Sequence, residues 1–195
     1  MGTEWSYTNG AGQEIRLHDA RLTELGIAQA RAVNTFWRHA LAELKTPAPQ
    51  SYYVSPLDRA LATAWHTFHD LELPDDRPFQ PVVKENLRET LGVHACDSRS
   101  PASYIRSTYP SYVIEPGFVE EDELFSPDIR ETHRQMNVRF QRLLNEIFEN
   151  DQSTFVSFTA HSGATMALLR VLKHREFALQ TGGLIAVLVR ADRAN

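Results

Sequence analysis

The stretch STFVSFTAHSGATMALLRVL, residues 153–172, decides the fold of this 195-residue chain. Its first part, 153–159, is rich in β-branched and aromatic residues, which predicts a strand. Residues 163–173 follow with the composition of a helix, and His161 stands at the turn between the two. A strand that runs directly into a helix is typical of proteins built around a parallel sheet.

A second junction of this kind follows the strand-like run SYYVS, residues 51–55. The next helix is predicted to have Ser55 as its N-cap, Pro56 at its first position and Asp58 completing a pattern like a capping box. The β-branched run GLIAVLVRA, 183–191, is predicted to be a buried strand. Strands that alternate with helices indicate an α/β three-layer sandwich, in which helices flank a mainly parallel sheet.

Further elements lie between these two junctions and before them. Thr23 is predicted to cap a helix, and a long helix is predicted to end near Asn150, after an acidic loop at 117–128. Residues 73–81 are predicted to be a linker, and 82–99 a mixture of short strand and loop. The first of these helices has an apolar stripe at helical spacing, formed by Val33, Phe36, Trp37, Ala40, Leu41 and Leu44.

Composition limits the kinds of function that the chain can have. Its 195 residues suffice for one domain, which is predicted to cover 1–195. The net charge of -5 gives no global attraction for nucleic acid, and no apolar run approaches the ~20 residues that span a membrane. A single cysteine, Cys96, excludes an internal disulfide. A cytoplasmic protein with neither nucleic acid nor membrane as partner is expected, and nothing indicates an oligomeric state.

Two side chains at the strand-to-helix junctions are suited to binding an anion. Ligands of open α/β sheets collect at the carboxyl ends of the strands, where helix N-termini offer amide donors. Arg59, on the first turn after its junction, has a planar fork of donors for phosphate, and the imidazole of His161 can bind charge or move a proton. A surface salt bridge for Arg59 and a buried structural histidine at 161 are the alternatives.

Five segments that cover nearly the whole chain carry a family resemblance. They are DARLTELGIAQA (19–30), SPLDRALATA (55–64), KENLRETLGVHACDSRS (84–100), EPGFVEEDELF (115–125) and TAHSGATMALLRVL (159–172). In this order they resemble the histidine phosphatase superfamily of phosphoglycerate mutase-like proteins, and its fungal branch in particular. The resemblance implies a reaction in which a first histidine becomes phosphohistidine, a second histidine and two arginines bind the phosphoryl group, and an acid protonates the leaving group.

The resemblance assigns roles to particular residues. Arg59 is expected to bind phosphate, and His161 to be the second histidine of the pocket. Glu89 matches the family's acid, and Arg99 matches a basic position at the pocket rim, for which an ordinary surface arginine is the alternative. Ser162 is expected to offer a backbone donor. Two neighbours complicate this assignment, because Glu85 competes with Glu89 for the role of acid and helix packing alone would explain Gly163.

The family's first histidine has no counterpart in this sequence. It normally lies in Arg-His-Gly or Arg-His-Ala at the end of the first, central strand, so the domain is expected to be truncated at its N-terminus relative to the family. One Arg-His-Ala occurs, at 38–40, but it falls inside the helical stripe and is interpreted as a coincidence. His18 is a possible substitute, with a solvated loop histidine as the alternative.

Other polar and aromatic groups carry weaker signals. A zinc site needs three or four converging ligands, so neither a metal nor a cofactor is expected from the pairs His66/His69 and His94/Cys96. The acidic run Glu120–Glu123 is interpreted as a solvated loop, with cation binding as the alternative, and its region resembles the family's cap over the pocket. Core packing or the lining of a substrate cavity would explain four aromatic residues, Trp5, Tyr7, Trp65 and Phe125.

These observations predict a phosphatase that hydrolyses a small phosphate monoester through a phosphohistidine mechanism, with the nucleophilic histidine absent from this chain. Its ligand would be a small phosphorylated metabolite or inorganic phosphate, and a mutase is less favoured. One alternative is a pseudophosphatase that binds anions without turnover. Another is an isomerase or lyase in which His161 and Glu89 act as acid and base on a small metabolite.

Overall fold

The computed structural model describes residues 6–8, 11–12 and 14–192, and these contain two sheets. A small antiparallel hairpin pairs β1 (Ser6–Thr8) with β2 (Glu14–Arg16). The main sheet is entirely parallel and has the strand order β5-β4-β3-β6. Its strands are β3 (Ser51–Val54), β4 (Val82–Val83), β5 (Val113–Ile114) and β6 (Val156–Thr159).

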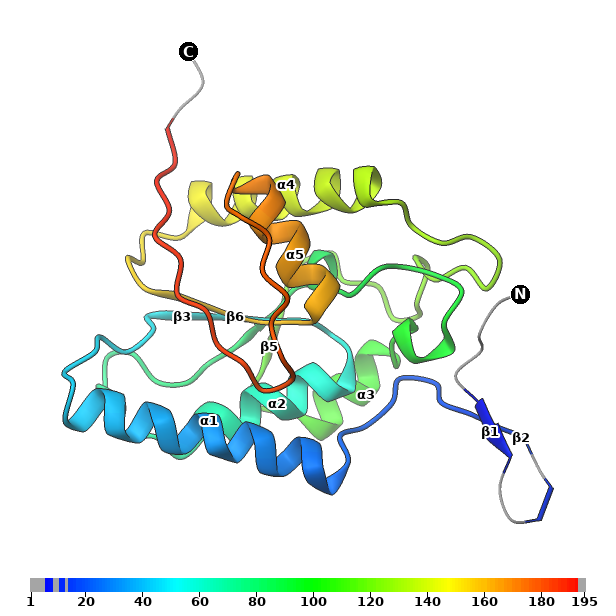
Figure 1. Cartoon of the computed structure of the whole chain (residues 1–195), viewed down its shortest axis with the longest axis horizontal. Coiled ribbons are helices and arrows are strands. Elements are labelled where there is room, and N and C mark those ends of the chain that lie inside the picture. Colours follow the sequence, from blue (N-terminus) through cyan, green and yellow to red (C-terminus); the bar gives the residue numbers. More distant parts are fainter. Residues whose placement is uncertain (1–5, 9–10, 13, 193–195) are drawn as a thin grey trace.

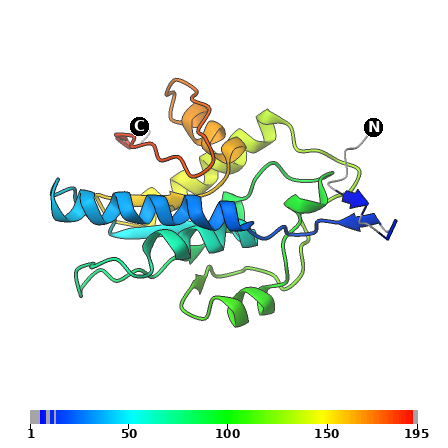
Figure 2. The same ribbon diagram turned by 60° about the horizontal axis from the view of Figure 1, so that its bottom comes forward.

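Helices cover both faces of the main sheet (Figure 1). On one face lie α1 (Glu24–Ala42), α2 (Asp58–Phe68) and α3 (Ala102–Thr108), and on the other lie α4 (His133–Asn150) and α5 (Ser162–Val171). The hairpin projects from one end of the molecule (Figure 2). The three-layer sandwich with a mainly parallel sheet is therefore confirmed, although its helices cover a sheet of short strands.

Strand β3 divides the core between the two faces. Tyr53 packs with the apolar residues of α4 and α5, whereas Val54 packs with those of α2 and α3 and Tyr52 packs with Phe68. Successive side chains of a strand point to opposite faces, so Tyr53 contributes to the core on one face while Tyr52 and Val54 contribute to the core on the other. This strand is almost completely buried on both sides, which is usual for parallel sheets.

Helix α1 begins and packs largely as its sequence predicts. Thr23 caps it, accepting a hydrogen bond from the Gly26 amide to its hydroxyl oxygen. Trp37, Ala40 and Leu41 lie on its buried or half-buried face, as the stripe requires. Phe36 and Leu44 of that stripe are 48% and 60% exposed, so the packed face is narrower than predicted.

The N-terminus of α2 is capped differently from the prediction. Ser55 is not its N-cap, because the helix begins at Asp58 and Leu57 occupies the cap position without a side-chain bond. The buried carboxylate of Asp19 instead accepts from the amides of Asp58, at 2.8 Å, and Ser100, at 2.8 Å. A cap supplied from a distant part of the chain satisfies the same orphan amide and leaves Ser55 free for another contact.

The predicted buried strand at 183–191 does not form. This segment belongs to neither sheet, and Leu184 and Leu188 are 47% and 102% exposed. A Cβ added at Gly182 would lie 3.1 Å from Cβ of Gln29, so the chain meets α1 just before this segment. Figure 1 shows the chain after α5, in orange and red, running across the direction of β3 and β6, where no ladder can form.

Strand β6 begins three residues later than predicted, whereas the end of α4 and the character of residues 82–99 agree with the sequence. Helix α4 ends at Asn150 and begins with a capping box between Thr132 and Gln135. Residues 82–99 hold β4 and two short 3-10 turns, η1 (Glu85–Leu87) and η2 (Ala95–Asp97). None of the helices in the described part of the chain is both long and apolar enough to cross a membrane.

Replacing Asp19 by alanine should lower the free energy of unfolding by about 2 kcal/mol, because it leaves the Asp58 and Ser100 amides without their acceptor. Chemical denaturation measures this change. Asp75→Ala, in the exposed 73–81 linker, is the matched control and should change the free energy by less than about 0.5 kcal/mol. Equal effects of the two substitutions would contradict the capping role of Asp19.

Candidate active site

The carboxyl ends of β3 and β6 bring Ser55 and His161 together. Val54 pairs with Thr159 in the parallel ladder, so the residues that follow them leave the sheet side by side. The Ser55 amide continues this ladder to the Thr159 carbonyl at 3.1 Å. Nε2 of His161 then lies 2.8 Å from the Ser55 hydroxyl oxygen, which fixes the direction of the ring.

Glu89 reaches the same place from the other side. Its Oε2 accepts a hydrogen bond from the Gly163 amide at 2.9 Å, in the first turn of α5 and two residues after His161. Its Oε1 accepts from the amide and the hydroxyl of Thr90, at 2.8 and 3.0 Å. A Cβ at Gly163 would lie 2.0 Å from Oε1, so only glycine allows this approach.

Glu85, the competitor of Glu89 for the role of acid, is engaged elsewhere. Its carboxylate forms ion pairs with Arg88, at 2.9 Å, and with Arg99, at 2.8 Å. Both of its carboxylate oxygens are thus bound to buried guanidinium groups, so Glu85 points toward Arg88 and Arg99. The geometry therefore places Glu89, rather than Glu85, beside His161.

Arg59 lies on the first turn of α2 and is anchored by two contacts. Nη2 pairs with Oδ1 of Asp97 at 2.9 Å, and Nη1 donates to the Cys96 carbonyl at 2.5 Å. Its side chain is 24% exposed, so it is accessible from outside the core. Asp97 also pairs with Arg130 at 2.9 Å.

The environment of His161 favours its neutral form. Burial lowers the pKa of His161 well below the ordinary value, and the positive charges of Arg59, Arg88 and Arg139 lower it further. A neutral imidazole with one nitrogen on Ser55 can donate or accept a hydrogen bond through the rest of its ring. The positive charge of the site comes from the arginines, because His161 is uncharged at neutral pH.

Arg99 is buried, so the alternative of an ordinary surface arginine is wrong, while its place at the rim of the pocket stays a prediction. Its side chain is 0% exposed. Beyond its ion pair with Glu85, it donates to the carbonyls of Ser100, Val119, Glu120 and Glu121 at 2.8–3.1 Å. Phosphate binding by Arg99 stays a prediction, and it would require these bonds to break.

The acidic run is exposed at Glu120, Glu121 and Glu123, as its interpretation as a solvated loop requires, but Asp122 is held by buried arginines. Asp122 pairs with the fully buried Arg88, with Nη2 2.6 Å from Oδ2, and also accepts from the Arg99 amide at 2.9 Å. The charge of Arg88 holds the pKa of Asp122 below its usual range against the opposing effect of burial. Sequence reasoning did not predict the contacts of Arg88 with Asp97 and Asp122, or of Asp97 with Arg59, because these partners lie 9 to 38 residues apart.

Several other predicted residues lie away from these groups or outside the described part. Ser162 is the exposed first residue of α5, and His18 and His39 are exposed. Trp65 stacks on His69, with ring centroids 4.3 Å apart, which is a packing contact. Phe125 is half-buried in the acidic loop. Trp5 lies outside the described residues, and so does the side chain of Tyr7.

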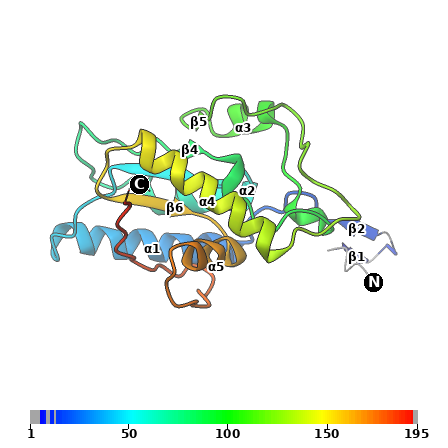
Figure 3. The same cartoon turned by 90° about the horizontal axis from the view of Figure 1, so that it is seen from above.

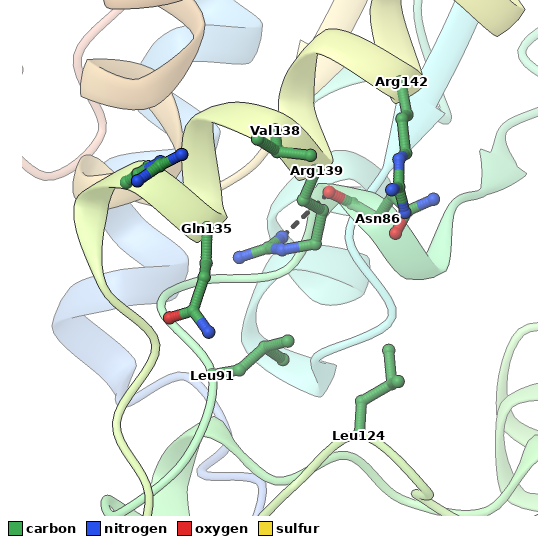
Figure 4. Close-up of a pocket in the computed structure, with 8 residues that line it drawn as sticks. Asn86, Leu91, Leu124, Gln135, Val138, Arg139 and Arg142 are labelled. Atoms are coloured by element: carbon green, nitrogen blue, oxygen red, sulfur yellow. Dashed lines mark hydrogen bonds between the residues drawn. The ribbon is translucent and has the colours of Figure 1, made fainter.

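No group of three or more metal-binding side chains is found among the residues that the structure describes. His69 instead lies 3.9 Å from Asp70, and His94 lies 3.7 Å from Asp97. A cavity of about 540 Å³ lies beside α4, and neither Arg59 nor His161 is among the residues that line it (Figure 4). Its lining is formed by Asn86, Leu91, Leu124, Arg134, Gln135, Val138, Arg139 and Arg142.

The model of the histidine phosphatase superfamily (branch 1) matches residues 2–184. The chain belongs to this superfamily. It is 52% identical over 188 residues to a protein of Arthroderma benhamiae named "Probable phosphoglycerate mutase", covering 96% of this chain and 56% of that one. The chain thus spans little more than half the length of this relative.

Two further relatives are yeast proteins that are each 33% identical to this chain. "Phosphomutase-like protein 3" of Candida albicans matches over 91% of this chain and 54% of its own. "Probable phosphoglycerate mutase PMU1" of Saccharomyces cerevisiae matches over 95% and 68%. The fungal character suggested by the sequence motifs is borne out by all three relatives.

Solved structures agree on the fold. A mycobacterial glucosyl-3-phosphoglycerate phosphatase matches with a TM-score of 0.50 and 20% identity, covering 82% of this chain and 73% of that one. A protein named "Mycobacterial hydrolase 2" matches with the same TM-score and identity, covering 82% and 65%. At this identity the likeness establishes a shared fold.

The lowered pKa of His161 should make folding sensitive to acid. Below about pH 6.5 the unfolded chain binds a proton at this histidine and the folded chain does not, so stability falls as the pH falls. Between pH 7.5 and 5.5, without phosphate, the wild type should lose about 1 kcal/mol more unfolding free energy than His161→Asn. Denaturation curves at both pH values measure this difference, and parallel losses would show that His161 titrates normally.

Proposed function

We propose that this chain carries the phosphate-binding and proton-donating groups of a phosphatase that acts on a small phosphate monoester. The observation that carries this proposal is the convergence of His161 and Glu89 at the N-terminus of α5, where His161 is the N-cap residue and Glu89 accepts from the Gly163 amide. Burial lowers the pKa of His161, and the positive charge of Arg59 lowers it further. A half-buried imidazole, a carboxyl group and an arginine are the types of group that phosphate-ester cleavage by this superfamily would need.

Each group has a separate task in this proposal. Arg59 binds two phosphoryl oxygens with its fork of donors, and His161 donates a hydrogen bond to a third. Glu89 gives its proton to the leaving oxygen. The negative charge of a bound phosphate favours the protonated form of a neighbouring carboxyl, so the substrate itself would prepare the acid.

The nucleophile is the missing part of this mechanism in the sequence at hand. The Arg-His-Ala at 38–40 lies inside α1, where Arg38 is bound to Asn34 and Asp70. This placement supports the interpretation of that motif as a coincidence. It also favours a second candidate function, in which the chain binds phosphate or a phosphorylated metabolite without forming phosphohistidine.

Anion binding tests the convergence without requiring turnover. Vanadate or phosphate at ~100 times its Kd should stabilise the folded chain by about 2.7 kcal/mol, because it binds only the native state. Arg59→Ala should remove most of this effect, since it removes the partly exposed fork of donors. Glu89→Gln should leave the stabilisation by the anion unchanged or increase it, because it removes the negatively charged carboxylate that lies at the Gly163 amide.

Thermal unfolding with and without the anion measures these effects, and His39→Ala is the control. His39 is exposed on α1, so this variant should keep the full shift of the wild type. A shift in melting temperature that is absent, or that Arg59→Ala leaves intact, would contradict both the phosphatase and the anion-binding proposals.

Turnover separates the two proposals from each other. The 195-residue chain should hydrolyse p-nitrophenyl phosphate, sugar phosphates and phosphoglycerates far below ~1 per second, because covalent catalysis needs a nucleophile. Joining an upstream strand that ends in Arg-His-Gly, taken from a relative that has one, should raise the rate into the range of ordinary enzymes. An extended protein that folds and binds vanadate yet hydrolyses nothing would favour the non-catalytic candidate.

A further inference from the structure

Arg139, on α4, contacts the backbone on both sides of the proposed acid. Its Nη1 donates to the carbonyls of Asn86 and Arg88, both at 2.9 Å, and its Nη2 donates to the carbonyl of Glu89 at 3.1 Å. Figure 4 shows this side chain reaching from the helix toward Asn86. Three of the four carbonyls between 86 and 89 thus point at one guanidinium group.

Glu131 fixes Arg139 in turn. Its Oε1 accepts from Nε of Arg139 at 2.9 Å, and its Oε2 accepts from Nη2. Both side chains are almost fully buried, with 8% and 7% exposed. Glu131 also binds the far side of the same segment, because its carboxylate accepts from the Leu91 amide and its own amide donates to the Leu91 carbonyl.

The geometry accounts for all five N–H donors of Arg139. Two go to Glu131 and three go to carbonyls of the segment that carries Glu89. The segment itself is irregular there, since η1 ends at Leu87 and no ladder or helix follows it up to Leu91. Backbone without regular structure needs an outside partner to hold one conformation.

We propose that Arg139, held by Glu131, is a positioning residue that keeps the Glu89 carboxylate on the Gly163 amide beside His161. It acts through the main chain of Glu89 and touches neither substrate nor reacting atoms. The inference rests on the proposed function in naming Glu89 as the proton donor. The positioning of Glu89 by Arg139 depends only on contacts within this chain.

The Gly163 amide reports whether Glu89 is in place. Its proton signal in the NMR spectrum of the 195-residue chain should shift when the carboxylate acceptor is lost, and Glu89→Ala defines the size and direction of that shift. Arg139→Lys should move the Gly163 signal in the same direction by at least half as much. Lysine keeps the charge, but its three donors on a single nitrogen cannot span Glu131 and three carbonyls.

Two controls separate positioning from general loosening. Arg142→Lys, on an exposed part of the same helix, should leave the Gly163 signal at its wild-type position. The Thr165 amide, which donates to the His161 carbonyl at 2.8 Å, should keep its signal in every variant. A folded Arg139→Lys with an unmoved Gly163 signal, or with Gly163 and Thr165 both displaced, would overturn the proposal.

A double variant covers the case in which Arg139→Lys does not fold. Arg139→Met combined with Glu131→Met removes both buried charges and leaves neither unpaired, and it should also displace the Gly163 signal. None of these measurements needs an anion or turnover. A chain that shows the expected Gly163 shift but fails to bind vanadate would contradict the proposed function and leave the positioning of Glu89 standing.

Discussion

The parallel pairing of β3 with β6 is the constraint on which the candidate site depends. It joins residues more than 100 positions apart in register, so that Ser55 and His161 leave the sheet together. Both strands are followed by a helix, and both helices then point their N-termini toward the same edge. A change of one residue in register would turn the junction of one strand away from that of the other.

Buried arginines hold the irregular half of the molecule in place, as strand pairing holds the sheet. Arg88, Arg99 and Arg139 are 0%, 0% and 8% exposed, and each is bound by at least one carboxylate. Removing a single partner from such a pair usually costs about 3–5 kcal/mol, because the other charge is left buried. Figure 3 shows the long green segments between β4 and α4 that these contacts hold. The proposed acid lies within this half, so its place depends on ion pairs rather than on regular structure.

Local patterns in the sequence predicted much of this arrangement, and long-range contacts account for the rest. The strand-to-helix turn at His161 and the Thr23 cap could be predicted because neighbouring residues determine them. The Asp19 cap on α2 could not, since no local signal links residues 39 positions apart. Similarly, the β-branched run at 183–191 has the composition of a strand but no partner in the described sheets. Composition gives the propensity for a strand, and pairing decides whether it forms.

Asp97 and Arg130 explain how Arg59 can be both anchored and available. Arg88, Arg99 and Arg139 are 0%, 0% and 8% exposed, whereas Arg59 is 24% exposed. If Arg59 turned its fork toward a phosphate, the buried carboxylate of Asp97 would still be paired with Arg130, at 2.9 Å. The cost of leaving a charge unpaired, which would oppose ligand binding, is thereby avoided. Arg130 is itself fixed by the carbonyls of Thr90 and Gly92, so the counter-charge that frees Arg59 is held by the same segment that carries Glu89.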